Sequence, residues 1–241
     1  MKKFLCLMLI CCMAVSIFAC VDPVDQTTTT TTTGKDDPAT ANALTWAEFM
    51  AAEDDSEIVI EGYVQGKQSW WDNKCSLYLQ DENGGYFLYE LACSEENYAR
   101  LTVGTKIRVT GYKTSWAGLH EVAAGATFEI IEGSYVAEPI DVTDKLGTEE
   151  LFNYQTMLVE FKGLTVVGIE YKGGTRGDDI YVNLTYNGNS YSFCIERYLT
   201  GPESDVYLAV EALQEGDVID VVGFAYWYNG INTHITSITV K

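Results

Sequence analysis

The sequence predicts an all-β protein with short helices, built from two tandem copies of one small barrel. The main observation is an internal repeat, because residues 101–122 align without a gap with residues 213–234. Such a repeat indicates two copies of one structural unit. Composition agrees: aromatic residues make up 12% of the 241 residues, and rings fit a pleated, half-buried surface. The identical positions are Leu101/Leu213, Gly104/Gly216, Ile107/Ile219, Val109/Val221, Gly111/Gly223 and Gly118/Gly230.

The amino-terminal segment joins two basic residues, Lys2 and Lys3, to an apolar run over residues 4–18. This run is shorter than a membrane-spanning helix. It ends in Ile-Phe-Ala-Cys at residues 17–20, which resembles the lipobox of bacterial lipoprotein signal peptides. The resemblance implies that residues 1–19 are removed and that Cys20 is acylated. The protein would then be lipid-anchored at a bacterial cell membrane or outer surface, outside the cytoplasm. Ordinary secretion with a coincidental cysteine is the alternative.

Residues 20–43 predict a disordered tether. They contain seven consecutive threonines, at residues 27–33, and almost nothing apolar to bury. The expected role of this segment is to hold the folded part away from the membrane.

The first copy is expected over residues 44–133. Thr45 and Glu48 have the spacing of a capping box, so a short helix should begin there. Residues 81–85 carry Asn-Gly and Gly-Gly turn signals, which predict a hairpin. The expected strands are 58–64, 76–80, 86–91, 105–112 and 119–131, the last one broken near Gly125, with a short helix or turn at 94–100.

The second copy is expected over residues 137–241. Its hairpin is centred on Asn187 and Gly188, and a longer connection covers residues 198–212. Three strands, a short helix and two strands is the order of an OB-fold, a five-stranded, partly open Greek-key barrel. An SH3-like barrel is the alternative, and the position of the helix favours the OB-fold. The expected strands are 156–166, 179–185, 190–196, 218–226 and 231–240.

Three strings, at residues 154–163, 77–81 and 103–111, resemble the OB-like modules attached to bacterial secreted nucleases and surface lipoproteins. The resemblance covers nearly all of residues 44–241 and implies a fold. It does not imply hydrolysis, because the chain contains no candidate for the separate catalytic domain of those nucleases.

No group of residues in the sequence predicts catalysis, a metal site or a cofactor, so the chain is expected to be a non-enzyme. His120 and His234 lack partners for a metal site or a catalytic triad and are interpreted as surface or hairpin-side residues. Paired acidic residues arise by chance in a chain with 35 Asp and Glu against 15 Lys and Arg.

Three cysteines, Cys75, Cys93 and Cys194, follow the predicted lipid-attachment site. A hairpin centred on Gly84 would place Cys75 directly opposite Cys93, within about 5 Å between Cβ atoms. The sequence therefore predicts a Cys75–Cys93 disulfide and leaves Cys194 as a small buried side chain.

OB-folds bind ligands on strands 2 and 3 and with the loops that join strands 1–2 and 4–5. Rings at those places can stack on bases or sugars, although strand alternation sends about half of them into the core. The candidate ligand-binding residues are Trp70, Trp71, Tyr78, Tyr89, Trp116, Tyr226, Trp227 and Tyr228.

The expected function is non-catalytic binding of a carbohydrate, a peptide or a partner protein. The formal net charge of −20 ranks nucleic acid lower, because phosphates bind through Lys and Arg. Single-stranded nucleic acid stays the second hypothesis, and a structural spacer without a ligand is the third. The basic residues that support the second are Lys67, Lys74, Arg100, Lys106, Arg108 and Lys113.

Overall fold

The computed structural model describes residues 42–241. The predicted signal peptide, the predicted acylation at Cys20 and nearly all of the predicted tether therefore lie outside the described residues. All described residues belong to one compact unit. Over residues 42–241, no helix is both long enough and apolar enough to cross a membrane.

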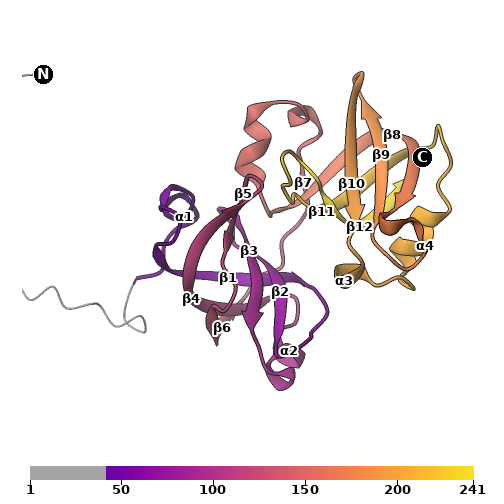
Figure 1. The fold of residues 1–241 in the computed structure, drawn as a ribbon. Coiled ribbons are helices and arrows are strands. Elements are labelled where there is room, and N and C mark those ends of the chain that lie inside the picture. Colours follow the sequence, from indigo (N-terminus) through magenta and orange to yellow (C-terminus); the bar gives the residue numbers. More distant parts are fainter. Residues whose placement is uncertain (1–41) are drawn as a thin grey trace, which may run out of the picture. The chain divides into compact units, whose positions relative to one another are not determined.

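The first sheet is a closed barrel with the predicted OB-fold order (Figure 1). Its order is β1-β2-β3-β5-β4-β6, and a further β1–β4 pairing closes a ring of five strands. β3 and β5 run parallel, whereas the other neighbours are antiparallel. The expected break near Gly125 is confirmed, because it separates β5 from β6. The strands are β1 (Glu57–Lys67), β2 (Lys74–Gln80), β3 (Gly85–Ala92), β4 (Thr105–Trp116), β5 (Leu119–Val122) and β6 (Thr127–Ser134).

Two short helices accompany this barrel, α1 (Trp46–Ala51) and α2 (Glu95–Arg100). The predicted capping box of α1 is confirmed: the Glu48 amide donates to Thr45 Oγ1, and the Thr45 amide donates to Glu48 Oε2 at 2.8 Å. α2 lies between β3 and β4 in the chain, as the OB-fold order requires, and Ser94 caps it.

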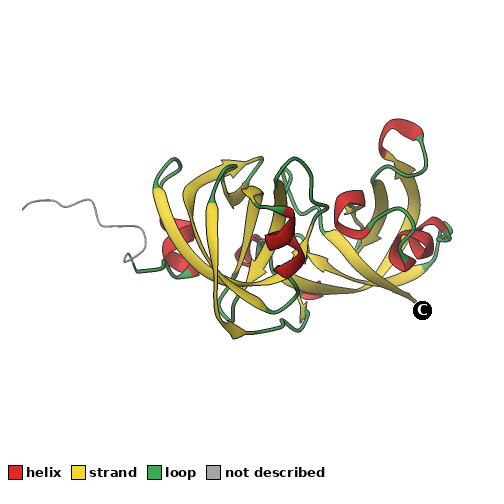
Figure 2. Cartoon of the chain, turned by 90° about the horizontal axis from the view of Figure 1, so that it is seen from below, coloured by secondary structure: helices red, strands yellow, loops and turns green. Residues whose placement is uncertain are grey.

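The five closing strands of the second sheet repeat this order, whereas its additional strand β7 pairs with β8, which corresponds to β1. The sheet runs β11-β12-β10-β9-β8-β7, and a β11–β8 pairing again closes five strands, with β10 parallel to β12. Short helices lie in the connections, outside the strands (Figure 2). Because both sheets share one compact unit, a division into separate domains at 44–133 and 137–241 stays a prediction. The elements are β7 (Ile140–Asp141), η1 (Thr143–Lys145), η2 (Glu149–Tyr154), β8 (Leu158–Tyr171), η3 (Lys172–Gly174), β9 (Ile180–Tyr186), β10 (Asn189–Ile195), α3 (Arg197–Thr200), α4 (Asp205–Glu211), β11 (Val218–Phe224) and β12 (His234–Val240).

Each sheet encloses its own apolar core, and a third buried cluster joins the two copies. This cluster contains Tyr78, Phe87, Leu119 and Phe224. The Tyr78 ring stacks on the Phe224 ring with 4.1 Å between centroids and 5° between planes. β2 and β3 of the first copy therefore pack against the end of β11 in the second, so part of the surface that OB-folds use for ligands is covered here by protein.

Hydrogen bonds reinforce this contact between the copies. The Leu158 amide donates to Gln80 Oε1 at 2.7 Å, and Gln155 Nε2 donates to the Gly118 carbonyl at 2.7 Å. The Asn229 amide donates to the Ala117 carbonyl at 2.6 Å. Ala117 and Asn229 occupy equivalent turns of the repeat, so the copies meet partly through their matching turns.

The glycines shared by the repeat include a pair required by close packing. A Cβ on Gly111 would lie 2.7 Å from the Ala126 Cβ, and a Cβ on Gly223 would lie 2.3 Å from the His234 carbonyl oxygen. Both distances are shorter than real contacts allow. The repeated glycine thus marks the place where the fourth strand of each barrel approaches the chain that follows it.

Candidate ligand-binding cleft

A cleft of about 850 Å³ lies where the two copies meet. It is open to solvent on one side, and side chains from both barrels line it. The first copy contributes the β1–β2 loop, β2, β3 and the end of β4. The second contributes η3, the ends of β9 and β10, α3, the β11–β12 connection and the start of β12. The lining residues are Gln68, Ser69, Trp71, Ser76, Phe87, Tyr89, Glu90, Trp116, Lys172, Asp179, Tyr181, Cys194, Glu196, Tyr198, Tyr226, Tyr228, Asn232 and His234.

Exposed rings mark the rim of this cleft. The side chains of Trp71, Trp116 and Tyr228 are 54%, 58% and 57% exposed. They come from three different segments, the β1–β2 loop, the last residue of β4 and the β11–β12 connection. The Lys74 ammonium lies 3.8 Å from the centre of the Trp71 ring, which holds that ring in place. Exposed apolar groups gathered in this way are typical of interaction sites.

The structure brings five of the eight candidate ligand-binding residues to the cleft, and three lie elsewhere. Tyr78 is fully buried against Phe224. Trp70 is half-buried, and its Nε1 donates to the Cys93 carbonyl at 2.8 Å. Trp227 packs edge-on against Phe152, with 5.5 Å between centroids. The residues that line the cleft are Trp71, Tyr89, Trp116, Tyr226 and Tyr228.

His234 is a buried residue of the cleft, so its interpretation as a surface or hairpin-side histidine is wrong. Its Nδ1 forms a 2.7 Å hydrogen bond with the Tyr78 hydroxyl across the contact between the copies. Its ring stacks on Tyr226, with 4.2 Å between centroids. Burial lowers the pKa of His234 to about 3, so the ring is neutral at pH 7. His120, by contrast, is half-buried and hydrogen-bonded to Ser115.

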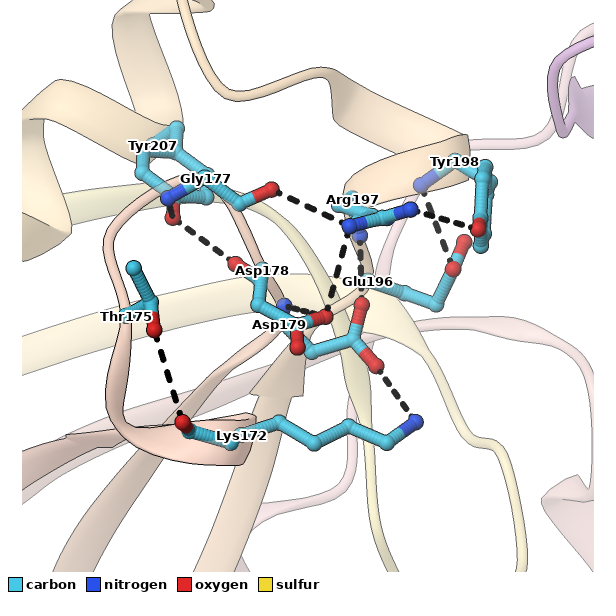
Figure 3. Close-up of polar contacts among 10 residues, drawn as sticks. Lys172, Thr175, Gly177, Asp178, Asp179, Glu196, Arg197, Tyr198 and Tyr207 are labelled. Carbon is cyan, nitrogen blue, oxygen red and sulfur yellow. Dashed lines mark hydrogen bonds and ion pairs between the residues drawn. The ribbon is translucent and has the colours of Figure 1, made fainter.

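Two acidic residues, Asp179 and Glu196, lie at the end of the β9–β10 hairpin, with the Asp179 carboxyl group toward Lys172 and that of Glu196 toward Tyr198 (Figure 3). Asp179 Oδ2 accepts from Lys172 Nζ at 3.0 Å, and Asp179 Oδ1 accepts from the Arg197 amide at 3.0 Å. Glu196 Oε1 accepts from the Tyr198 amide at 3.1 Å and so caps α3. Within residues 42–241, Glu196 Oε2 has no hydrogen-bond partner although it is buried. Burial raises the pKa of Glu196 to about 7.

The basic residues of the first copy do not form an unpaired cationic groove. Lys106 and Arg108 both pair with Glu61, with N···O distances of 2.8 and 2.9 Å. The buried Lys113 ammonium donates to backbone carbonyls near the end of α1. Lys74 pairs with Glu90 at 2.8 Å. The charged side chains that line the cleft are mostly acidic: Glu90, Asp179 and Glu196 against Lys172.

Cys75 and Cys93 are free thiols in the structure, as is Cys194. The prediction that Cys75 lies directly opposite Cys93 is wrong, because Cys75 pairs with Leu91 and a bulge follows it. The two thiols nevertheless lie within hydrogen-bonding reach of each other. Their disulfide stays a prediction. Cys194 is buried, as predicted, and lines the cleft. Within residues 42–241, no group of three or more His, Cys, Asp or Glu side chains could hold a metal ion.

The polar residues of the cleft are not among the residues predicted from the sequence. The register of the second hairpin could have identified two of them, Asp179 and Glu196. The Asn187–Gly188 turn sets the hairpin register, in which Tyr186 pairs with Asn189 and Ile180 with Ile195. Continuing that register by one residue places Asp179 opposite Glu196. No comparable signal exists for His234, because its partner Tyr78 belongs to the other copy.

No family model matches the sequence, and no curated protein matches it either. Solved structures show distant likenesses. A murine DNA-binding protein bound with double-stranded DNA has a TM-score of 0.37 at 10% identity, covering 76% of this chain and 94% of that one. The p204 HINb domain has a TM-score of 0.36 at 8% identity, covering 79% and 100%. A replication protein A heterotrimer bound to single-stranded DNA has a TM-score of 0.32 at 12% identity, covering 76% and 50%. Likenesses this distant transfer no ligand to this chain, so its function is argued from the cleft.

Proposed function

We propose that this chain is a non-catalytic binding protein, that its two OB-like copies act as one unit, and that a carbohydrate occupies the cleft between them. The observation that carries the proposal is the presence of three exposed rings, Trp71, Trp116 and Tyr228, in a lining that also holds polar side chains. A sugar has an apolar ring face that can lie on an aromatic side chain, and hydroxyl groups that need both donors and acceptors. Gln68 and Asn232 in the lining offer both.

Charge supports a carbohydrate over a polyphosphate chain. Three acidic side chains and one lysine line the cleft, and that lysine already pairs with Asp179. A phosphate backbone would meet repulsion there, because nucleic-acid affinity depends on neutralising phosphates with Lys and Arg. The hydroxyl groups of a neutral sugar can donate to the same carboxylates.

Single-stranded nucleic acid is the second candidate, and the exposed rings favour it too. Every base has a face that can stack on an aromatic side chain, with about 1–3 kcal/mol per base. Trp71, Trp116 and Tyr228 are each more than half exposed, so a base can reach them from solvent. This candidate requires the ligand to approach the rim through its bases, with its phosphates directed away from the carboxylates.

Tryptophan fluorescence measured during titration separates the two candidates. Soluble oligosaccharides and single-stranded oligonucleotides are titrated at low and high salt, with parent protein, Trp116→Ala and an exposed off-cleft control, Tyr112→Ala. Quenching by a neutral sugar that is insensitive to salt, with a half-saturation concentration raised in Trp116→Ala but not in Tyr112→Ala, supports the main proposal. Quenching by oligonucleotide that weakens steeply with salt supports the second. If neither oligosaccharides nor oligonucleotides bind, the remaining hypothesis is a structural spacer without a ligand.

The proposed location of the protein is the outside of a bacterial cell, on a lipid anchor at Cys20. The basis is the lipobox-like sequence at residues 17–20. Expression of the full chain in a bacterium, followed by detergent partitioning and mass spectrometry of the mature amino terminus, tests the anchor. Acyl chains on Cys20 and their loss in Cys20→Ala support it, whereas an unmodified Cys20 within an uncleaved chain contradicts it.

A further inference from the structure

We infer that the cleft selects sugars that carry a positively charged amine, and that Glu196 is the residue that sets this preference. This inference rests on the proposed function and adds the chemical class of the ligand. It is carried by Glu196, a buried carboxyl group in the lining of the cleft whose own protein contacts leave it incompletely paired.

The hydrogen bonds to the Glu196 carboxyl group come from the backbone of α3, where the Tyr198 amide and, more weakly, the Leu199 amide stabilise its charged form. Oε1 accepts from the Tyr198 amide, whereas Oε2 is buried with no partner among the described residues. A buried carboxylate without full pairing is costly, and the usual solutions are a proton or a cation. The structure therefore leaves room for a cationic group to improve the environment of this carboxylate.

The charged groups around Glu196 do not supply that cation. Asp179, opposite it on the hairpin, adds a second negative charge. Lys172 bonds to Asp179 and acts on Glu196 only through weaker, longer-range attraction. From the other elements, Tyr78 and Tyr226 are near enough for the charge of Glu196 to raise the pKa of each phenol, and the Tyr78 hydroxyl itself bonds to His234. The Arg197 guanidinium pairs with Asp178 and donates to the Tyr198 hydroxyl, so neither cation forms an ion pair with Glu196 itself.

Some rings in the lining of the same cleft also suit a cation. An ammonium or guanidinium group is attracted to the face of an aromatic ring within about 6 Å. Lys74 and Arg197 already occupy faces of Trp71 and Tyr198, at 3.8 and 4.6 Å from the ring centres. Trp116 and Tyr228 are exposed lining rings that hold no cation of residues 42–241, so they are the rings open to a ligand ammonium. A protonated sugar amine could form charge-assisted interactions with the carboxyl groups and the ring faces of this cleft. A hydroxyl group in the same position could form only the weaker interactions of a neutral group.

Protonation is consistent with this assignment. Burial raises the pKa of Glu196 to about 7, so this carboxyl group is about half protonated at pH 7. A ligand cation would stabilise the charged form and displace the proton. Selection for an amine therefore does not require Glu196 to be fully ionised before the ligand arrives.

The test compares two β-1,4-linked tetramers by calorimetry at pH 7, one of glucose and one of glucosamine, which differ in one group per ring. The parent protein is expected to bind the amine-bearing tetramer about tenfold more tightly, because a hydrogen bond between charged groups is stronger than one between neutral groups. In Glu196→Gln this preference should disappear, while binding of the glucose tetramer persists. The glutamine side chain keeps an oxygen that can accept from the Tyr198 amide, so the cap of α3 is preserved.

Glu132→Gln is the matched control, because it removes the same charge from an exposed residue outside the cleft lining. Its amine preference should equal that of the parent. Equal binding of both tetramers by the parent, or an unchanged preference in Glu196→Gln, overturns the inference and leaves the proposed function standing. Binding of neither tetramer by the parent overturns the proposed function itself.

Discussion

At the scale of single residues, Glu196 makes folding stability depend on pH. Its pKa is raised to about 7 in the folded state by burial, above its ordinary value of 4.5. The folded state therefore holds its proton more tightly, and this contribution to stability is present at low pH and is lost as the pH rises through 7. The neutral amide introduced by Glu196→Gln would not titrate.

We therefore expect the free energy of unfolding of Glu196→Gln, relative to the parent, to increase between pH 5 and pH 8. The upper bound on this increase is about 3 kcal/mol, from the size of the pKa shift. Urea unfolding at both pH values measures it. Glu132→Gln should follow the parent at each pH. A difference in stability between the parent and Glu196→Gln that stays constant with pH would contradict the assignment.

The Tyr78–His234 hydrogen bond is the second residue-scale feature. It joins two buried side chains from different copies at 2.7 Å. Tyr78→Phe would keep the stacking on Phe224 but leave the His234 nitrogen without a partner. The expected loss is about 1–3 kcal/mol of unfolding free energy, measured by chemical denaturation. Tyr112→Phe, at an exposed tyrosine, should change little. Equal stabilities of the two variants would show that the bond contributes nothing.

The predicted disulfide can be tested by counting free thiols. Cys75 and Cys93 are near enough to hydrogen-bond, and Cys194 lies apart in the other copy. In the oxidising environment predicted outside the cytoplasm, we expect the mature chain, denatured without reductant, to show one free thiol, from Cys194. Labelling with a thiol reagent before and after reduction measures this. Three free thiols would reject the disulfide.

At the scale of elements, substitution of Gly223 tests whether close packing requires the glycines that the two copies share. A Cβ there would lie 2.3 Å from the His234 carbonyl oxygen, so β11 or the start of β12 would have to move. Gly223→Ala should destabilise the fold by about 1–3 kcal/mol or more in thermal or urea unfolding. Gly168→Ala is the matched control, because nothing lies within 4 Å of a Cβ at that strand position. Similar stabilities for both variants would mean that the backbone of β11 can shift to accommodate the Cβ at little cost in free energy.

Elements whose signals are local were predicted well. The capping box of α1 and both hairpins lie where turn and cap residues indicated. The predicted strand 218–226 is too long, because the chain leaves β11 after Phe224. The Ala225 amide bonds to the Met157 carbonyl, and Tyr226 packs on His234. Contacts with distant residues, rather than strand propensity, end this element.

At the scale of the whole molecule, the two copies should unfold together. A buried cluster joins them, and hydrogen bonds such as Tyr78–His234 and Leu158–Gln80 cross between them. Unfolding one copy alone would expose Phe224, Tyr78 and these polar groups. We expect one calorimetric transition, with tryptophan fluorescence and far-ultraviolet circular dichroism changing at the same temperature. Two separated transitions would show that the copies are independent domains.

The sequence by itself determined the β-rich class, the repeat, the strand order and the aromatic residues from which the rim is built. These features follow from alternation, turn chemistry and composition, which act between residues near each other in the chain. Only the tertiary structure decided that Tyr78 is buried, that His234 is its partner, and that Asp179 and Glu196 line one cleft with Trp71 and Trp116. The reason is physical: burial and pKa depend on how the two copies pack, and that contact joins residues more than 100 positions apart.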